Sequence, residues 1–180
     1  MKKENDDLVN KQGRPQKKTS TVDPLRAQFD IFLALITVTT IVFGDRFSKI
    51  YFSKALTLGE SWPVVRNIFH MTLVHNTGIA FGLFKNQGIV FIVIPIIAII
   101  LLVFNIYYYG NNKDDLSRTY IVAFSLILGG AIGNLIDRIY FGYVIDFIDF
   151  RIWPVFNVAD SAITIGAMII LLKCIPSSAK

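Results

Sequence analysis

The residues of this sequence best suited to chemistry are aspartates and asparagines beside apolar segments. Two Asn-x-x-Asp units, Asn134/Asp137 and Asn157/Asp160, place an amide and a carboxyl group on one face wherever the segment is helical. Two carboxyl groups held close together cannot both ionise without a large cost, so the pair holds one proton between them. Such a pair can activate water as a base and protonate a leaving amine as an acid, which is the chemistry of peptide hydrolysis. The same acids could instead carry protons or bind a cation in a transporter, and the spacing alone does not separate the two.

Cysteine and histidine offer little further chemistry. The single cysteine, Cys174, excludes an intramolecular disulfide, a dithiol redox mechanism and a cysteine-based metal cluster. His70 and His75 lie five residues apart, which suits neither an i,i+4 helical pair nor one face of a strand. We therefore expect no metal site and no organic cofactor.

The elements that must position the acids are membrane helices. Of the 180 residues, 53% are hydrophobic and only 17% are charged, against about 25% charged in an ordinary soluble domain. The chain is therefore expected to be an all-α integral membrane protein. Its apolar runs predict four transmembrane helices, over about 30–52, 88–109, 118–138 and 159–174.

The segments outside these helices differ in polarity and charge. Residues 1–29 predict a flexible, basic cytoplasmic tail; because it mixes acidic with basic residues, no nucleic-acid partner is expected. Segment 54–86 has strand-like stretches and predicts a small extracytoplasmic β subdomain, while 140–158 predicts a second loop on the same side. Residues 177–180 are expected to form a cytoplasmic end. Lys and Arg number 11 on the side of the two termini and 7 on the opposite side, so the positive-inside rule puts both termini in the cytoplasm.

Four crossings bring the polar ends of the helices to one face of the membrane. The residues at those ends are Asp45 with Lys49, Asn76 with Gly78, Asn134 with Asp137, and Asn157 with Asp160; Asp146 and Asp149 lie in the loop between the last two helices. An ionisable residue at membrane depth costs roughly 2.5–3.5 kcal/mol, so several carboxylates on one face indicate a functional site.

Simpler roles stay open for three of these acids. Asp160 precedes an apolar run and could only cap its helix. Asp149 could sit in the headgroup region without a function. Asp137 has Arg138 beside it, so an ion-paired, orienting role is at least as well supported as direct chemistry.

Five motifs, in order over residues 45–166, resemble a known family. They are Asp45-Arg-Phe-Ser-Lys49, Asn76-Thr-Gly-Ile-Ala-Phe-Gly82, Gly129-Gly-Ala-Ile-Gly-Asn-Leu-Ile-Asp-Arg138, Val144-Ile-Asp-Phe147 and Phe156-Asn-Val-Ala-Asp-Ser161. Together they resemble lipoprotein signal peptidase, also called signal peptidase II, a family of aspartyl membrane peptidases. The sequence departs from the usual pattern at Arg46, Ser48 and Ile79, where the family often has Gln, Thr and Ala.

The resemblance implies an endopeptidase that removes signal peptides from bacterial prolipoproteins. It would hydrolyse the bond before the diacylglyceryl-modified cysteine, with water and a catalytic dyad of Asp146 and Asp160, within a membrane peptidase domain over 30–176. Substrate-binding or supporting roles would fall on Asp45, Lys49, Asn76, Gly78, Asn134, Asp137, Arg138, Asn157 and Ala159. The resemblance also implies an enzyme of the bacterial cytoplasmic (inner) membrane, in contact with lipids and with its active site near the outer face. We expect it to be a monomer.

Two other function classes fit these residues less well than a peptidase does. A small proton-coupled transporter or channel predicts ionisable residues spread through the bilayer depth, yet the acids here cluster at one end and the 88–109 run carries no charge. A structural membrane subunit leaves the convergent Asp and Asn residues unexplained. The peptidase is therefore the favoured reading, although the roles of base and acid within the dyad stay unassigned.

Overall fold

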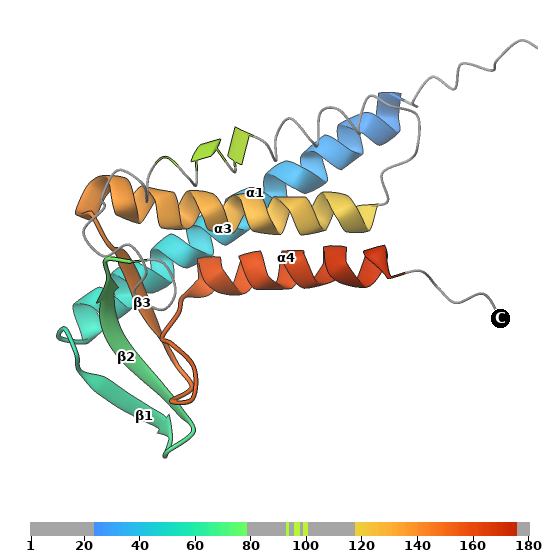
Figure 1. Ribbon diagram of the computed structural model, residues 1–180. Helices are drawn as coiled ribbons and strands as arrows, with labels where there is room; N and C mark the ends of the chain where they lie inside the picture. Colours follow the sequence, from blue (N-terminus) through green and yellow to red (C-terminus); the bar gives the residue numbers. More distant parts are fainter. Residues whose placement is uncertain (1–23, 79–92, 94–95, 98, 101–117, 176–180) are drawn as a thin grey trace, which may run out of the picture.

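The computed structural model describes residues 24–78, 93, 96–97, 99–100 and 118–175. Within these residues the chain forms helices α1 (Pro24–Ala55), α3 (Arg118–Phe141) and α4 (Val158–Cys174), and strands β1 (Ser61–Val65), β2 (Phe69–Asn76) and β3 (Val144–Asp149) (Figure 1). The helix expected over 88–109 lies largely outside the described residues, although the five described positions in it are helical. Of the tail expected over 1–29, residues 1–23 lie outside the described residues, and so does the expected end 177–180.

The first helix is longer than the sequence predicts. Helix α1 begins at Pro24, inside the segment expected to be a tail, and runs to Ala55. Proline suits the first helical turn, because the N–H that it lacks would have no intrahelical partner there. An ion pair between Arg26 and Asp30, at 3.9 Å and one turn apart, lies in this added stretch.

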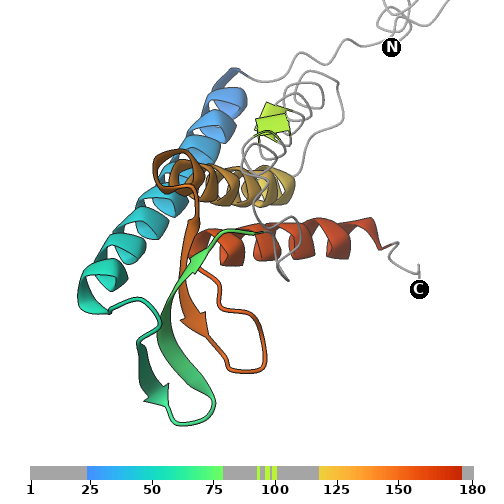
Figure 2. The same ribbon diagram turned by 60° about the vertical axis from the view of Figure 1, so that its left-hand side comes forward.

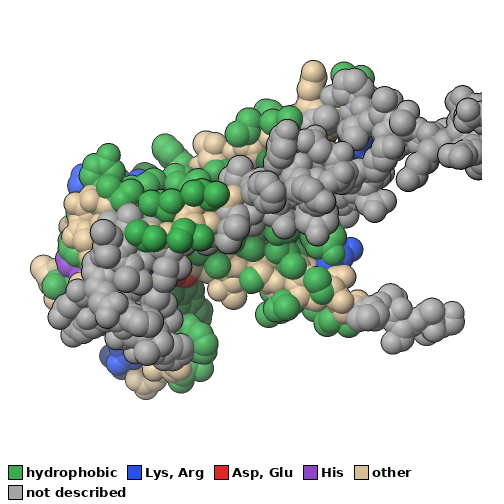
Figure 3. Space-filling model, turned by 45° about the horizontal axis from the view of Figure 1, so that its top comes forward, with side chains coloured by type: hydrophobic (Ala, Val, Ile, Leu, Met, Phe, Trp, Pro, Cys, Tyr) green, Lys and Arg blue, Asp and Glu red, His purple; other side chains and the backbone are tan. Residues whose placement is uncertain are grey.

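Two of the helices are long and apolar enough to cross a membrane, at Gln28–Ala55 and Arg118–Phe141. Only 6% of the most apolar window of α1 is buried within the molecule, and Phe32 and Phe43 are 61% and 73% exposed. Exposed apolar side chains on this scale suit contact with lipid rather than water. Figure 3 shows hydrophobic side chains, in green, over the helical part of the surface. The prediction of four transmembrane helices stays a prediction, because the described residues hold these two candidates.

Small residues let the helices approach closely. Helix α3 packs against both α1 and α4. A Cβ added to Gly130 would overlap the carbonyl oxygen of Ala159, and one added to Gly133 would lie 2.7 Å from Oδ2 of Asp45. Glycines at such crossings allow backbones and polar groups to come together inside a membrane bundle.

The expected small β subdomain is present as a three-stranded antiparallel sheet in the order β1-β2-β3. Figure 2 shows it at one end of the helices, beside the C-terminal end of α1. Pro63 lies on the edge strand β1, where a missing N–H costs no central ladder bond. A small apolar core of Leu56, Leu73 and Ile145 joins the sheet to the end of α1.

The segment 140–158, expected to be a loop, contains the strand β3. The run Val144–Asp149 is mostly β-branched or aromatic apart from its two aspartates, and it is almost wholly buried. Gly142, with φ of 77°, follows the last turn of α3, and its N–H donates to the Arg138 carbonyl. This tight turn folds β3 back along β2, so Asp146 is held in a sheet rather than in a loop.

Candidate active site

Lys49 forms the centre of a buried ionic cluster between α1 and α3. Its side chain has no exposed surface. The ammonium Nζ lies 2.8 Å from Oδ2 of Asp45 and 2.9 Å from Oδ2 of Asp137, and it donates to Oδ1 of Asn134 at 3.0 Å. The ammonium therefore lies against two carboxylates and donates to one amide oxygen, so its buried charge is compensated.

Asp137 links this cluster to the strand that carries Asp146. Its Oδ1 pairs with Arg46, and its Oδ2 accepts a 3.1 Å hydrogen bond from the backbone N–H of Ile145. Arg46 also lies over the ring of Phe141, 5.3 Å from the centroid. Asp137 thus fixes the backbone next to Asp146 while two cations balance the charges of Asp45 and Asp137.

Asp45 performs a similar task for α4. Its Oδ1 accepts a 2.9 Å hydrogen bond from the backbone N–H of Ala159. This N–H belongs to the first turn of α4, where backbone donors have no intrahelical partner. The buried ionic cluster around Lys49 therefore positions the start of α4, and with it Asp160.

Asp146 lies on β3 and is 1% exposed. Its Oδ1 accepts a 2.7 Å hydrogen bond from Nδ2 of Asn157, and its Oδ2 accepts one of 3.0 Å from Nδ2 of Asn76. The Asn76 amide is itself oriented, because its Oδ1 accepts from the N–H of Gly78 at 3.0 Å. Both oxygens of Asp146 are therefore held by amides from separate elements.

Asp160 lies in the first turn of α4. The N-cap of the helix is Asn157, and Asp160 is the third residue of a capping box, so the N-cap role considered for Asp160 belongs to Asn157. Oδ1 of Asp160 also accepts a 2.7 Å hydrogen bond from Nδ2 of Asn134. The carboxyl group therefore does more than cap, since one of its oxygens is held by α3.

The two asparagines join Asp146 and Asp160 into one network. Nδ2 of Asn157 lies 3.0 Å from Oδ1 of Asn134 as well as donating to Asp146. Asn134 in turn donates to Asp160 and accepts from Lys49. The two Asn-x-x-Asp units that the sequence singles out meet at this point, and each amide serves the carboxyl group of another element.

Burial raises the pKa of the Asp146 carboxyl to about 7, and the negative charge of Asp160 adds to this rise. The hydrogen bonds from Asn76 and Asn157, and the charge of Lys49, act in the opposite direction. A carboxyl group with this pKa exchanges its proton readily near neutral pH. Arg138 lies within electrostatic range of Asp160, Asp146 and Asp137.

Asp149 is set apart from this network. It accepts from Thr72 at 2.7 Å and from the Arg151 side chain at 3.0 Å. Burial would raise its pKa, but these hydrogen bonds outweigh burial and hold the pKa below its usual value. The partners are ordinary structural ones, which agrees with the simpler role considered for Asp149.

Arg46 and the backbone N–H of Ile145 are two contributors to the site that the sequence motifs do not predict. Arg46 appeared only as a departure from the family pattern, although it lies three residues before Lys49 and thus near the same helix face. The Ile145 N–H could not be found from residue types, because any residue supplies it. The described residues contain no group of three or more His, Cys, Asp or Glu side chains arranged to hold a metal ion.

Solved structures with a similar fold define the class of the protein. One, described as a bacterial membrane enzyme at 2.3 Å resolution, is 33% identical, covers 82% of this chain and 92% of its own, and superposes with a TM-score of 0.71. A second, described in the same words at 1.9 Å, is 32% identical, covers 81% of this chain and 94% of its own, and has the same TM-score. With its two apolar helices, this chain is likewise a membrane enzyme.

Sequence relatives narrow this class to one family. Residues 36–176 match the family model described as Signal peptidase (SPase) II. A lipoprotein signal peptidase of Halothermothrix orenii is 44% identical over 78% of this chain and 93% of its own length, and one of Caldanaerobacter subterraneus subsp. tengcongensis is 45% identical over 77% and 92%. The chain belongs to the signal peptidase II family and is an aspartic peptidase, as its motifs predict.

Proposed function

We propose that this protein removes the signal peptides of bacterial prolipoproteins, hydrolysing the bond before the diacylglyceryl-modified cysteine, with Asp146 and Asp160 as the catalytic pair. The observation that carries the proposal is the joint anchoring of these acids. Asn157 holds Asp146 at 2.7 Å, Asn134 holds Asp160 at 2.7 Å, and the two amides contact each other. The relatives named lipoprotein signal peptidase support the choice of substrate.

In this mechanism the pair shares one proton. The ionised carboxylate takes a proton from water, and the resulting hydroxide attacks the scissile carbonyl carbon. The protonated partner hydrogen-bonds the carbonyl oxygen and then the oxyanion of the tetrahedral intermediate. Collapse of the intermediate breaks the C–N bond as the leaving amine gains a proton. The two roles belong to the pair rather than to one named residue, because such acids titrate together.

The surrounding residues position the pair. Asp45 and Asp137 hold the α4 backbone at Ala159 and the β3 backbone at Ile145, and Lys49 joins these two acids. The Arg138 charge offsets the charge of the pair. Asn76 orients Asp146 and is itself fixed by Gly78. No metal or organic cofactor takes part in the proposal, so cleavage should survive treatment with a chelator.

Substrate selection would rest largely on lipid burial. The helical signal segment would lie between the membrane helices, with the acyl chains of the substrate against apolar helix faces at ~0.8 kcal/mol per buried CH₂. The proposal places the enzyme as a monomer in the cytoplasmic membrane, with both termini in the cytoplasm and the aspartates near the outer face.

The test is gel-shift cleavage of a diacylglyceryl-modified prolipoprotein by the purified protein. Asp146→Asn and Asp160→Asn keep the side-chain shape but cannot act as acid or base, and each should abolish cleavage while the protein stays folded. Asp149→Asn is the matched control, since Asp149 lies on the same strand as Asp146 but outside the network, and it should cleave near the wild-type rate. Near-normal cleavage by Asp146→Asn or Asp160→Asn would refute the dyad, and a folded wild type that never cleaves would refute the substrate.

A further inference from the structure

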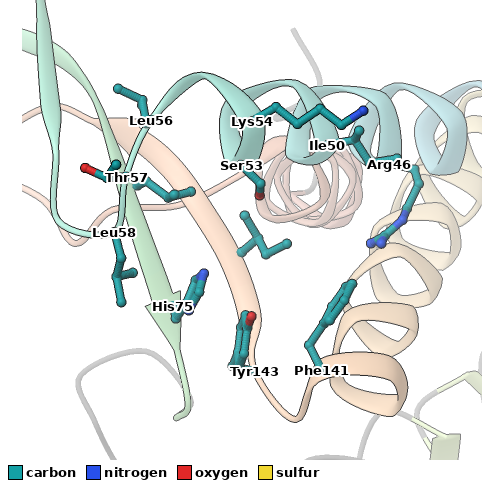
Figure 4. Close-up of a pocket in the computed structure, with 12 residues that line it drawn as sticks. Arg46, Ile50, Ser53, Lys54, Leu56, Thr57, Leu58, His75, Phe141 and Tyr143 are labelled. Carbon is teal, nitrogen blue, oxygen red and sulfur yellow. The ribbon is translucent and has the colours of Figure 1, made fainter.

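A groove of about 590 Å³ lies at the end of α1 (Figure 4). Its walls come from the last turns of α1, the end of α3 and strands β2 and β3. Figure 4 shows Ser53 and Arg46 on one side and the rings of His75, Tyr143 and Phe141 on the other. The groove is therefore built jointly by the helices and the sheet.

Strand alternation separates this groove from the catalytic pair. His75 and Ile145 are paired across β2 and β3, and both line the groove. Asn76 and Asp146, the next residue on each strand, face the opposite side of the sheet, where they hydrogen-bond to each other. A ligand in the groove would thus be separated from Asp146 by the β2–β3 pair.

The aromatic wall is a continuous stack. His75 stacks on Tyr143 with centroids 4.0 Å apart, Tyr143 stacks on Phe141 at 5.8 Å, and Arg46 lies over Phe141. Such a stack restricts the movement of this wall, because each ring is held by its neighbour.

The charge of the groove is positive. None of the described residues that line the groove is acidic, whereas two of them, Arg46 and Lys54, are basic. Arg46 is balanced by Asp137, but Lys54 is exposed and forms no ion pair within the described part of the chain. Ser53, His75 and Tyr143 add further hydrogen-bonding groups, so the groove offers donors suited to an anion.

The groove also lies where the membrane surface must be. Both candidate spans end here, α1 at Ala55 and α3 at Phe141. Below it the outer face of α1 is apolar, with Phe43 and Phe47 exposed by 73% and 66%. An anionic headgroup in the groove would therefore leave its acyl chains against an apolar helix face.

We propose that this groove binds the headgroup of an anionic phospholipid from the leaflet at which α1 and α3 end, with Lys54 as its main cation. The proposal does not rest on the cleavage reaction, because binding is measured without a peptide substrate. The phosphate would contact Lys54 and the adjacent Ser53, while the chains follow α1 towards Phe47.

The test is native mass spectrometry of the full-length protein in detergent, titrated with phosphatidylglycerol. Lys54→Gln should weaken binding of the first lipid about fivefold, as expected for one Lys near an anionic headgroup, and Lys54→Arg should restore it. Arg66→Gln is the matched control, because Arg66 is also exposed near the sheet but does not line the groove; it should bind like wild type.

Three results would overturn the proposal. Equal binding of phosphatidylcholine would show that the anionic charge is not recognised. Equal losses in Lys54→Gln and Arg66→Gln would indicate a general surface charge effect. Displacement of the lipid by inorganic phosphate would assign the groove to a free anion instead. Circular dichroism of each variant verifies that its helices are intact.

Discussion

Lys49 has no exposed surface, yet it carries a charge between two membrane helices. Three polar groups, from Asp45, Asp137 and Asn134, surround its ammonium. A buried charge that loses its partner is strongly destabilising, even where the pair itself adds little net stability. The cluster is therefore a structural requirement on α1 and α3 as well as support for the site.

Replacing this lysine by an apolar residue should expose that requirement. Lys49→Met keeps the length of the side chain but leaves two buried carboxylates without their shared cation, and we expect a loss of roughly 3–5 kcal/mol in the free energy of unfolding. Thermal unfolding in detergent measures the effect. Lys54→Met, five residues along the same helix and exposed, is the control and should unfold like wild type. Equal stability of the two variants would contradict the account of Lys49.

The pKa of Asp146 predicts how stability depends on pH. In the unfolded chain the group has its ordinary value of 3.8, and burial in the fold raises it to about 7. The folded state thus binds the extra proton, so the contribution to stability is fully present below the unfolded pKa and is lost as pH rises through about 7. Asp146→Asn removes this titration.

Melting curves of wild type and Asp146→Asn, recorded between about pH 5 and pH 8, test this sign. The stability of wild type relative to the variant should fall as pH rises. The cleavage rate of wild type should also fall above about pH 7, because the pair loses its shared proton. A stability difference that is constant, or that grows with pH, would exclude the raised pKa.

The helices are the elements that the sequence predicts best, because an apolar run of membrane length has few alternatives. The segments expected over 118–138 and 159–174 are helical as Arg118–Phe141 and Val158–Cys174. Strand β3 was not predicted, because a six-residue segment with two aspartates is also typical of a polar loop. Its strand character depends on pairing with β2, which is distant in sequence.

The close packing of α3 on α4 predicts that a larger residue at their crossing destabilises the fold. Gly130→Ala would drive a Cβ into the backbone carbonyl of Ala159, which a side-chain rotation cannot relieve. We expect a loss of about 1–3 kcal/mol in stability, as for other overpacked cores, measured by thermal unfolding. Gly44→Ala serves as the control, because a Cβ there meets nothing within 4 Å. If both alanine variants melted together, the tight crossing would be wrong.

At the scale of the whole molecule, the convergence of the candidate site residues could be predicted from the sequence, but their contacts with one another could not. Helix parity brings Asp45, Asn134 and Asp160 to one end, and the structure places them in one network. Parity says nothing of which amide meets which acid. The crossed arrangement of Asn134 with Asp160 and Asn157 with Asp146 depends on how α3, β3 and the start of α4 pack together. The role of Arg46 could not be predicted from the sequence, because a cation beside a predicted headgroup region is common.

The orientation of the whole molecule in the membrane can be tested with its single cysteine. Helix α4 starts beside the sheet and ends at Cys174, which is exposed. At 1.5 Å per residue, the two ends of this 17-residue helix lie about 25 Å apart. If both termini are cytoplasmic, a membrane-impermeant maleimide should label Cys174 in inverted vesicles and not in intact spheroplasts.

The matched reporter for the opposite side is Arg66→Cys in a Cys174→Ser background, since Arg66 lies in the exposed turn between β1 and β2. It should show the reverse pattern, with labelling in spheroplasts. Cys174→Ser alone should keep peptidase activity, because Cys174 is at the end of α4 opposite Asp160. Labelling of both positions from one side would mean that α4 does not cross the membrane. Labelling with the two sides exchanged would instead place the aspartates on the cytoplasmic face, where the proposed cleavage of exported prolipoproteins could not take place.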